Sequence, residues 1–409
     1  MPDRKYDLVV IGAGIVGLAS AMEILKRHPA LRLAVLDKEE QIAQHQTGHN
    51  SGVIHSGIYY APGSLKAKLC VSGKQKLIQF CQEHDIPYEL CGKIIVATTE
   101  EELPRLQNIY ERGLANGVPG VELIGPERIR EIEPECEGIR AIWSPTTGIV
   151  DFGRVALAYA DEVQARGGEI LTGHEVFDIK QQDGVYNLET SRGVVASKYI
   201  VSCAGLYADR IAEMTGAPKY PKIVPFRGDY YVLRPEKRHL VRGLIYPVPD
   251  PRFPFLGVHF TRRMDGEVWL GPNAVLAFAR EGYRRTDFNA RDLLEAVTYR
   301  GFGLLAWRYW RMGLEEMYRD FSKVAFLAAL KRYVPAIRAE DMLPGPSGVR
   351  AQALAPDGSL VDDFVFNRSG NALHVRNAPS PAATSSLAIG EVIAATAAKA
   401  FDLPTPVAH

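Results

Sequence analysis

One histidine in this chain stands where an acid–base catalyst could work. His259 lies in residues 256–263 (LGVHFTRR), and the alternation of apolar and polar residues there predicts a β-strand. Because successive side chains of a strand point to opposite faces, His259, Thr261 and Arg263 share one face. An imidazole titrates near neutral pH and can accept a proton. The face therefore predicts a pocket with His259 as the general base; the structural alternative is a histidine that only packs in the sheet.

Two further side chains complete the candidate chemistry. His55 lies in a small, polar, glycine-rich segment and is the rival candidate for the base. Arg350 ends the sequence Gly348-Val-Arg, and its planar guanidinium can bind a carboxylate through two hydrogen bonds. A surface salt bridge is the alternative for this arginine. A base and an anion anchor are two requirements for oxidising a hydroxy acid, and the third is a hydride acceptor.

A site for such an acceptor is predicted near the N-terminus. Residues 6–11 (YDLVVI) and 31–36 (LRLAVL) predict buried parallel strands, with a helix over residues 18–27 between them. The first strand is followed by GAGIVG, whose glycines permit a tight turn, approach of the backbone to a pyrophosphate, and close helix–sheet packing. An acidic residue ends the second strand, where it can accept from ribose hydroxyls. The residues expected to contact a dinucleotide here are Gly12, Gly14, Ile15, Val16, Gly17, Asp37 and Lys38.

The segment that follows favours a flavin over NAD. Residues 47–57 (TGHNSGVIHSG) are small, polar and rich in glycine, so their backbone can run past a flavin's pyrophosphate and ring. A loop near the C-terminus leads into a helix expected at Thr384, and a helix N-terminus at the flavin would stabilise the reduced anionic ring. The further residues expected to contact FAD are Thr47, His49, Asn50, Ser51, Gly52, Val53, Val176, Ala204, Gly205, Gly348, Ser380, Pro381, Ala382, Ala383 and Thr384.

Several of these motifs together resemble one family of flavoproteins. The run HNSGVIHSGIYY at 49–60, PGSLKAKLCVSG at 62–73 and the 12–17 glycines resemble the D-amino-acid-oxidase/glycerol-3-phosphate-dehydrogenase superfamily. Within it, the chain most resembles the L-2-hydroxyglutarate dehydrogenases. Later blocks agree, so that the resemblance spans nearly the whole chain: FRGDYY at 226–231, FLGVHFT at 255–261, GPNA at 271–274, SGVRAQ at 347–352 and NAPSPAATSS at 377–386.

The resemblance implies FAD, oxidation of L-2-hydroxyglutarate to 2-oxoglutarate, and electron transfer to a membrane acceptor such as a quinone, or to oxygen. Arg350 matches the G-x-R of the amino-acid oxidases, whose arginine binds the substrate carboxylate. Some superfamily members attach flavin covalently to a histidine near His55; we expect non-covalent FAD. Arg227, Tyr231, Thr261 and Arg263 are further candidates for contacts with the substrate, and the two arginines for a distal carboxylate.

The pattern of elements predicts an α/β and α+β protein with two interleaved domains. A discontinuous Rossmann-like FAD-binding domain is expected from residues 1–85, 151–218 and 343–409. Its middle part contains a helix over 152–166 capped by Asp151, and a β-meander with turns at 183–184 and 192–193. An antiparallel-sheet substrate domain is expected from residues 86–150 and 219–342.

Composition excludes some classes of protein. Lys+Arg and Asp+Glu number 48 each, so the net charge gives no sign of a nucleic-acid binder. The five cysteines form no C-x-x-C pair and have no histidine at zinc-site spacing, so no metal is expected. No leader pattern or apolar run long enough to span a membrane is present, which predicts a cytoplasmic protein, or one peripheral on the cytoplasmic face of the inner membrane.

A membrane contact, if there is one, is predicted in residues 300–333. Residues 302–314 (FGLLAWRYWRMGL) place aromatic and apolar side chains beside arginines on a helix. That composition is typical of a helix at a membrane interface. The alternative is a helix that packs on the substrate domain with its arginines extended to water.

Three other functions remain open on the sequence alone. An amino-acid or amine oxidase uses the same scaffold, and release of ammonia or amine from glycine or sarcosine would favour it. A flavin-bound protein without turnover would show no bleaching by any hydroxy acid. A NAD-dependent dehydrogenase would be colourless when purified.

Overall fold

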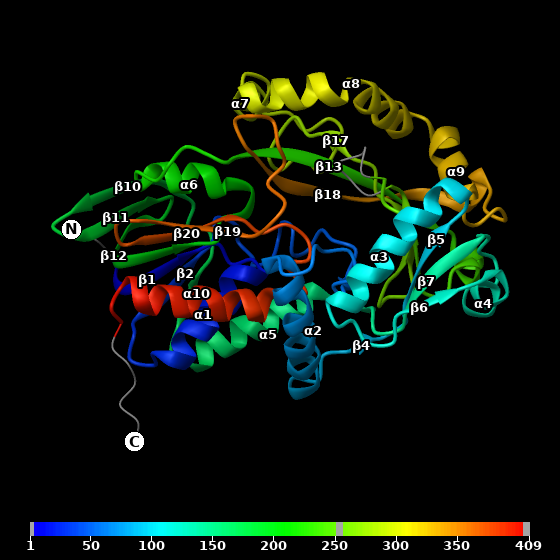
Figure 1. The fold of residues 1–409 in the computed structure, drawn as a ribbon. Coiled ribbons are helices and arrows are strands. Elements are labelled where there is room, and N and C mark those ends of the chain that lie inside the picture. The colour runs from blue at the N-terminus through cyan, green and yellow to red at the C-terminus, as the bar shows by residue number, and fades with distance from the viewer. Residues whose placement is uncertain (1–3, 251–256, 404–409) are drawn as a thin grey trace.

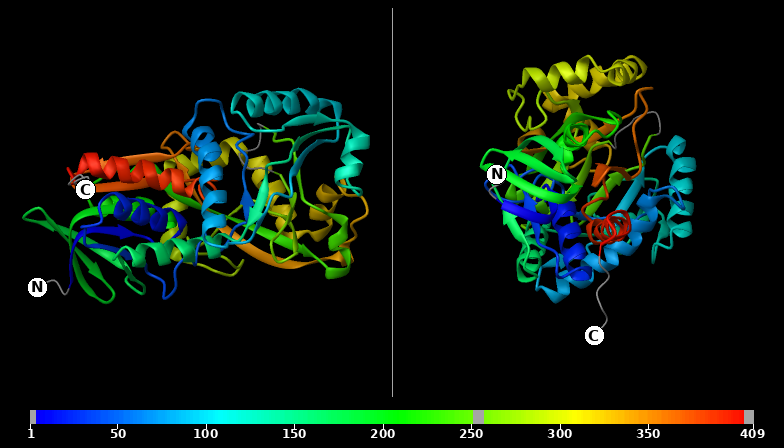
Figure 2. Two further views of the ribbon diagram at one scale, coloured as in Figure 1. Left: turned by 90° about the horizontal axis from the view of Figure 1, so that it is seen from below. Right: turned by 90° about the vertical axis from the view of Figure 1, so that its left-hand side faces the viewer.

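The computed structural model describes residues 4–250 and 257–403, and two large β-sheets dominate it (Figure 1). Seen from below, the molecule is elongated, with the first strand and the last helix at one end and the second sheet at the other (Figure 2). Two residues of the 255–261 block, Phe255 and Leu256, lie outside the described residues. None of the described helices is both long and apolar enough to cross a bilayer.

The first sheet has eight strands, and its parallel part follows from the N-terminal βαβ unit. β1 pairs in parallel with β2 and β12; β9 extends the sheet beside β2, and β20 lies beside the end of β12. Their buried, β-branched residues suit strands covered on both faces. β10 and β11 form an antiparallel hairpin on the other part of β12. The strands are β1 (Arg4–Ile11), β2 (Leu33–Leu36), β9 (Glu169–Leu171), β10 (Val176–Gln182), β11 (Val185–Thr190), β12 (Gly193–Ser202), β19 (Val365–Ser369) and β20 (Ala372–Asn377).

Three helices pack together below this sheet (Figure 1). They are α1 (Ile15–Arg27), α5 (Phe152–Ala165) and α10 (Ser386–Ala400), and α1 contacts both of the others. A Cβ at Gly390 of α10 would lie 2.8 Å from the Ala19 carbonyl oxygen of α1. The close crossing of α1 and α10 therefore depends on glycine at this position, and it fixes the start of α10 beside the N-terminal unit.

The second sheet is mostly antiparallel, in the order β17-β13-β16-β15-β14-β5-β7-β6, with β18 also pairing with β13. α3 and α4 cover one part of it and α7, α8 and α9 another (Figure 1). The elements are β5 (Lys93–Ala97), β6 (Glu122–Ile124), β7 (Arg140–Ser144), β13 (Lys222–Leu233), β14 (Leu244–Pro247), β15 (His259–Arg262), β16 (Val268–Gly271), β17 (Val275–Leu276), β18 (Met342–Leu354), α3 (Leu103–Ala115), α4 (Pro126–Ile132), α7 (Ala290–Val297), α8 (Arg300–Phe321) and α9 (Lys323–Lys331).

Shorter elements connect the two sheets. A small antiparallel sheet of β3, β8 and β4 lies between them, and α2 leads from the first toward the second. These elements are β3 (Val53–Ile54), β4 (Tyr88–Glu89), β8 (Gly148–Val150), α2 (Leu65–Glu83) and α6 (Ala208–Met214), with 3-10 turns at Glu100–Glu102, Gly205–Tyr207, Pro235–Leu240 and Ala339–Asp341.

The predicted fold class is confirmed, with two differences in detail. Asp151 caps α5 as expected, its carboxylate accepting from the Gly153 amide at 2.8 Å. The C-terminal helix begins at Ser386 rather than Thr384, because the Thr384 hydroxyl instead bonds the β3 segment. β18 was assigned by sequence to the FAD-binding part of the chain, yet it pairs along its length with β13 of the second sheet. Its pairing partner is distant in sequence, so local pattern alone could not place it.

Candidate active site

His259 opens β15, and its hydrogen bond defines its chemistry. Its Nδ1 lies 3.0 Å from the Gly257 carbonyl oxygen. Because a carbonyl can only accept, Nδ1 carries the proton and Nε2 is left with a lone pair. Burial, together with the positive charges of Arg350 and Lys93, lowers the pKa of this imidazole to about 3. His259 is therefore a neutral histidine whose Nε2 can accept a proton.

The neighbours of His259 on the sheet also face the candidate pocket. The His259 ring stacks on Tyr246 of β14, with ring centroids 4.1 Å apart. Thr261 is fully buried opposite Trp269 of β16. Arg263 lies over the Trp269 ring at 3.8 Å and donates from Nη1 to the Asn50 carbonyl at 2.7 Å. Arg263 thus ties the second sheet to the glycine-rich segment, and its guanidinium already has these partners.

Arg350 approaches the same region from β18. Its Nη1 lies 3.4 Å from the Asn273 carbonyl oxygen. Burial lowers the pKa of its guanidinium, while Tyr230 and Glu316 act in the opposite direction. The charge of Arg350 also lowers the pKa of His259, so the guanidinium lies near this imidazole.

His55 joins the glycine-rich segment to the loop before α10. Its backbone amide donates to the Thr384 hydroxyl at 3.1 Å, and that hydroxyl lies 3.3 Å from the Val53 carbonyl. Its Nε2 lies 3.3 Å from the Ser380 hydroxyl, while Nδ1 is buried with no hydrogen-bond partner in the described part of the chain. Burial, together with the charges of Lys93 and Lys66, lowers the pKa of His55 to about 3. Both candidate bases therefore lie near the same cation, Lys93.

Lys93 is a functional candidate that sequence reasoning missed. It opens β5, is 1% exposed, and its ammonium has no hydrogen-bond partner among residues 4–250 and 257–403. The Nζ atom lies 4.6 Å from the Tyr59 ring centre and 4.7 Å from that of Tyr246. Burial lowers its pKa to about 7. The available signal was a charged residue at the head of an otherwise apolar strand, KIIVA.

Two predicted substrate contacts are directed elsewhere. Arg227 is ion-paired with Asp229 at 3.0 Å and Asp320 at 3.6 Å, and it donates to the Arg284 carbonyl. Tyr231 packs edge-on against Phe326 of α9. Arg227 thus links β13 to α8, and Tyr231 links it to α9. No recorded contact joins either side chain to His259. Local alternation on β13 could not reveal this, because the Arg227 partner Asp320 lies on α8, and the register against β18 shifts between Asp229 and Tyr231.

The three glycines after β1 form a tight turn at the start of α1. Gly12 has φ +106°, and a Cβ there would lie 2.5 Å from the Cys203 carbonyl oxygen. A Cβ at Gly17 would lie 1.9 Å from the Gly12 carbonyl oxygen. A Cβ at Gly14 would meet only the Thr47 hydroxyl, at 3.4 Å, so this side of the turn is open. The turn is thus closed where it packs and open where a dinucleotide would approach.

The other expected dinucleotide contacts gather around this turn. The Thr47 hydroxyl accepts from the Ile15 amide at 3.0 Å, and the Asp37 carboxylate accepts from the Ala13 amide at 2.7 Å. Residues 173–176 lie beside the end of β2, because the His174 amide donates to the Asp37 carbonyl at 2.7 Å. Val16 continues the first turn of α1, Ala204 and Gly205 follow Cys203, and Val176 opens β10.

The turn, Asp37 and Thr47 together form what we call the cofactor cradle. The glycine-rich segment, residues 47–57, leads from this cradle toward the second sheet. A Cβ at Gly348 would lie 2.5 Å from the His49 carbonyl oxygen, and His49 Nδ1 lies 2.9 Å from the Ser347 carbonyl. Gly52 donates to the Asn50 side chain at 2.8 Å. These contacts bring the segment against β18, so that Ser51, Val53 and the loop Ser380, Pro381, Ala382 and Ala383 border the region between the two sheets.

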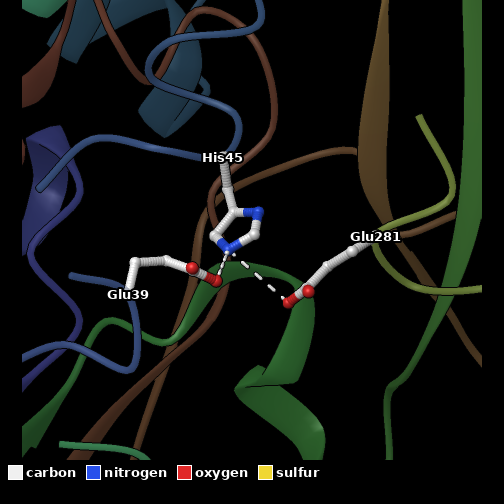
Figure 3. A group of neighbouring side chains, drawn as sticks. All are labelled: Glu39, His45 and Glu281. Carbon is white, nitrogen blue, oxygen red and sulfur yellow. Dashed lines mark hydrogen bonds and ion pairs between the residues drawn. The ribbon is translucent and has the colours of Figure 1, made fainter. Parts of the chain in front are cut away.

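A polar cluster at the end of β2 has the residue types of a metal site but a different role. Glu39, His45 and Glu281 converge as Figure 3 shows, with His45 Nε2 2.9 Å from Glu39 and 3.5 Å from Glu281. The Lys38 ammonium bonds both carboxylates. Because this lysine already pairs with both acids, the cluster serves as an ion-pair clasp between residues 38–45 and the loop at 281, and we assign it no metal.

Comparison with known proteins places this arrangement in a family. The family model "FAD dependent oxidoreductase" matches residues 7–396. The mitochondrial L-2-hydroxyglutarate dehydrogenase of Nematostella vectensis is 54% identical over 421 residues, covering 98% of this chain and 92% of that protein. The chain belongs to the L-2-hydroxyglutarate dehydrogenase family of FAD-dependent oxidoreductases. The family also includes the L-2-hydroxyglutarate dehydrogenase of Indibacter alkaliphilus, 49% identical and covering 97% of this chain and 100% of that protein.

Solved structures show the same fold in more distant flavoproteins. The L-alpha-glycerophosphate oxidase of Mycoplasma pneumoniae, with FAD bound, superimposes with a TM-score of 0.79 at 23% identity over 97% of this chain and 95% of that one. The glycine oxidase of Geobacillus kaustophilus gives 0.72 at 18% identity over 99% of this chain and 97% of that one. At these identities the likeness establishes the fold alone.

The cofactor of this family is FAD, and the cradle fits it. Gly14 gives α1 no side-chain cap, and the first turn of α1 contains no acidic residue. A helix N-terminus of this kind, facing the open side of Gly14, suits a diphosphate. His55 Nδ1 adds a buried polar atom without a partner among the described residues on the path toward the second sheet.

Proposed function

We propose that this chain oxidises L-2-hydroxyglutarate to 2-oxoglutarate, with bound FAD accepting a hydride from C2. The observation that carries the proposal is the neutral imidazole of His259, whose Nδ1 bonds to the Gly257 carbonyl, close to the half-buried guanidinium of Arg350. The relatives at 49–54% identity, all named L-2-hydroxyglutarate dehydrogenases, support the choice of substrate.

Two side chains of this site carry out distinct tasks in the proposed reaction. The Arg350 guanidinium binds the C1 carboxylate and sets the orientation of the C2–H bond. His259 Nε2 accepts the C2 hydroxyl proton as the carbonyl forms, and the Gly257 carbonyl keeps the proton on Nδ1. The His259 side chain is buried, which keeps water from the atom that accepts the proton.

The division of the chain into two domains is also a proposal. The first sheet with α1, α5 and α10 carries the dinucleotide cradle, and the second sheet carries His259 and Arg350. We place the FAD-binding domain in the first group and the substrate-binding domain in the second, with the site between them.

An anaerobic absorbance titration of the purified holoenzyme tests this function. L-2-Hydroxyglutarate is expected to bleach the visible flavin band, while D-2-hydroxyglutarate and L-lactate leave it unchanged. Bleaching by glycine or sarcosine, with release of amine, would replace the proposal with an amine oxidase. If none of these compounds reduces the flavin, the proposed activity is rejected and only the assignment of the fold stands.

We further propose that the protein is cytoplasmic and docks on a membrane through α7, α8 and α9, where it passes electrons to a quinone. Trp307 is 80% exposed, Trp310 55% and Phe321 73%. Arg308 and Arg311 lie beside them, and a cavity of about 550 Å³ with mostly apolar walls lies beneath α8. Exposed aromatic side chains beside arginine suit a lipid interface, and the cavity suits an apolar electron acceptor.

Replacing Trp307, Trp310 and Phe321 together with serine is expected to reduce co-sedimentation with anionic lipid vesicles at least tenfold. Inserting one such side chain into lipid contributes about 2 kcal/mol. Reduction of the flavin by substrate should be unchanged, since the three side chains are exposed on α8 and no recorded contact joins them to His259. Phe177→Ser is the matched control, because Phe177 is 56% exposed on β10 of the first sheet. Unchanged co-sedimentation of the triple variant would reject membrane docking.

A further inference from the structure

Lys93 presents a buried charge that its own fold does not neutralise. Its side chain is 1% exposed, and the Nζ atom has no hydrogen-bond partner among the described residues. An ammonium buried without a partner is strongly destabilising, so such groups are normally paired, or they mark a binding site. Burial lowers the pKa of Lys93 to about 7, and no carboxylate of the described residues is among the groups that shift it.

The surroundings of Lys93 place it in the candidate active site. The Tyr246 ring lies against the Lys93 ammonium on one side and against the His259 ring on the other. In the sheet, Lys93 pairs with Leu244, and Leu244 pairs with Thr261. The charge of Lys93 lowers the pKa of both His259 and His55. Lys93 therefore lies near both histidines.

A dicarboxylate needs two cations, and the other arginines considered for the second one are engaged. Arg227 is paired with Asp229 and Asp320. Arg263 donates to the Asn50 carbonyl, stacks on Trp269 and has its Nε 4.0 Å from the Asp265 carboxylate. Arg350 is already required by the C1 carboxylate. Lys93 is thus the buried cation near His259 whose charge the described residues leave uncompensated.

We propose that the Lys93 ammonium binds the distal carboxylate of the substrate and so makes the enzyme select 2-hydroxy dicarboxylates over 2-hydroxy monocarboxylates. The proposal rests on the function proposed above and deepens it. The flanking rings of Tyr59 and Tyr246 hold the ammonium by cation–π contacts while the site is empty, and the carboxylate supplies the opposite charge on binding.

The test compares two five-carbon substrates in the holoenzyme. L-2-Hydroxyglutarate and L-2-hydroxyvalerate differ only in whether the chain ends in a carboxylate or a methyl group. Lys93→Met should lower the ratio of their kcat/KM values at least 100-fold, mainly through a higher KM for the dicarboxylate. The affinity for glutarate, measured from the change that glutarate binding causes in the flavin spectrum, should weaken to a similar degree. Lys93→Arg, which keeps the charge, should retain part of the preference.

The matched control is Lys74→Met on α2. Lys74 is also buried, at 6% exposed, but its ammonium donates to the Thr146 hydroxyl at 2.9 Å. This variant should keep the wild-type ratio of kcat/KM values, which would show that loss of a buried lysine does not itself change specificity. If Lys93→Met fails to retain FAD, Lys93→Gln and Lys93→Arg carry the same comparison.

The pH dependence of binding gives a second readout that needs no variant. Below pH 7 Lys93 is protonated; above it, binding a dianion must first recharge the amine, so the Kd of glutarate should rise by up to tenfold per pH unit. The groups facing Lys93 do not titrate in this range. Burial raises the pKa of Cys70 to about 12 and raises the pKa values of Tyr59 and Tyr246 above their ordinary value, and the pKa values of His55 and His259 are about 3.

Three results would overturn the proposal in distinguishable ways. An unchanged substrate ratio in Lys93→Met, with a wild type that oxidises L-2-hydroxyglutarate, would reject the role of Lys93 alone. Equal loss of both substrates with normal glutarate binding would move Lys93 into the chemical step and also reject it. A wild type that does not oxidise L-2-hydroxyglutarate would reject the underlying function.

Discussion

Replacing His259 with alanine is expected to slow reduction of the flavin by L-2-hydroxyglutarate about 10²–10⁴-fold, the usual contribution of a positioned general base. The structure supports this size of effect because the His259 imidazole is neutral and its Nδ1 is held by the Gly257 carbonyl, which leaves Nε2 to take the proton. Anaerobic stopped-flow mixing of substrate with the oxidised holoenzyme measures the rate directly. FAD content should be unchanged, since no described residue of the cradle hydrogen-bonds to the His259 side chain.

His84→Ala provides the control for loss of a stacked histidine. His84 stacks on Phe80 with ring centroids 4.0 Å apart, much as His259 stacks on Tyr246, but it caps the far end of α2. That variant should reduce its flavin at the wild-type rate. If His259→Ala also does so, the base lies elsewhere, and His55, whose Nδ1 is buried and unpartnered among the described residues, becomes the candidate to replace next.

The cofactor cradle was the part of the fold most accessible from sequence, because local rules determine it. The 12–17 glycines, the strands on either side and the Asp151 cap each depend on neighbours within about one βαβ unit. The structure adds why two of the glycines are required: Gly12 and Gly17 each have a backbone carbonyl where a Cβ would be. Local geometry and tertiary packing therefore specify the same residues.

The second sheet was less accessible, because its register joins strands far apart in the chain. Lys93 of β5 reaches His259 only through β14, about 150 residues later, and nothing near Lys93 signals this pairing. From sequence, Arg227 and Arg350 were both candidates for binding a substrate carboxylate. In the structure, however, Arg227 is ion-paired with Asp229 and Asp320. Which cation is left without a partner is a property of the folded charge network, and this property indicates where an anionic substrate binds.

Replacing Arg350 with alanine is expected to raise the KM for L-2-hydroxyglutarate about 10- to 150-fold, corresponding to the roughly 1.5–3 kcal/mol of a hydrogen bond to a charged group. Since the same contact orients the C2–H bond, the limiting rate of flavin reduction should fall as well. The neutral Arg350→Met variant, similar in length and without the guanidinium, separates loss of charge from loss of packing volume.

Arg350→Lys separates the effect of charge from that of geometry, because it keeps the positive charge and removes the planar guanidinium. Lysine binds a carboxylate as a point charge, so this variant should recover part of the affinity and little of the limiting rate. Arg368→Ala on the exposed β19 is the matched control, since Arg368 bonds only the nearby Gly370 carbonyl at 2.7 Å among its recorded contacts, and both kinetic constants should stay at wild-type values. Wild-type kinetics in Arg350→Ala would mean that another cation holds the C1 carboxylate. If the Lys93→Met variant then lost both substrates together, Lys93 rather than Arg350 would be the C1 anchor.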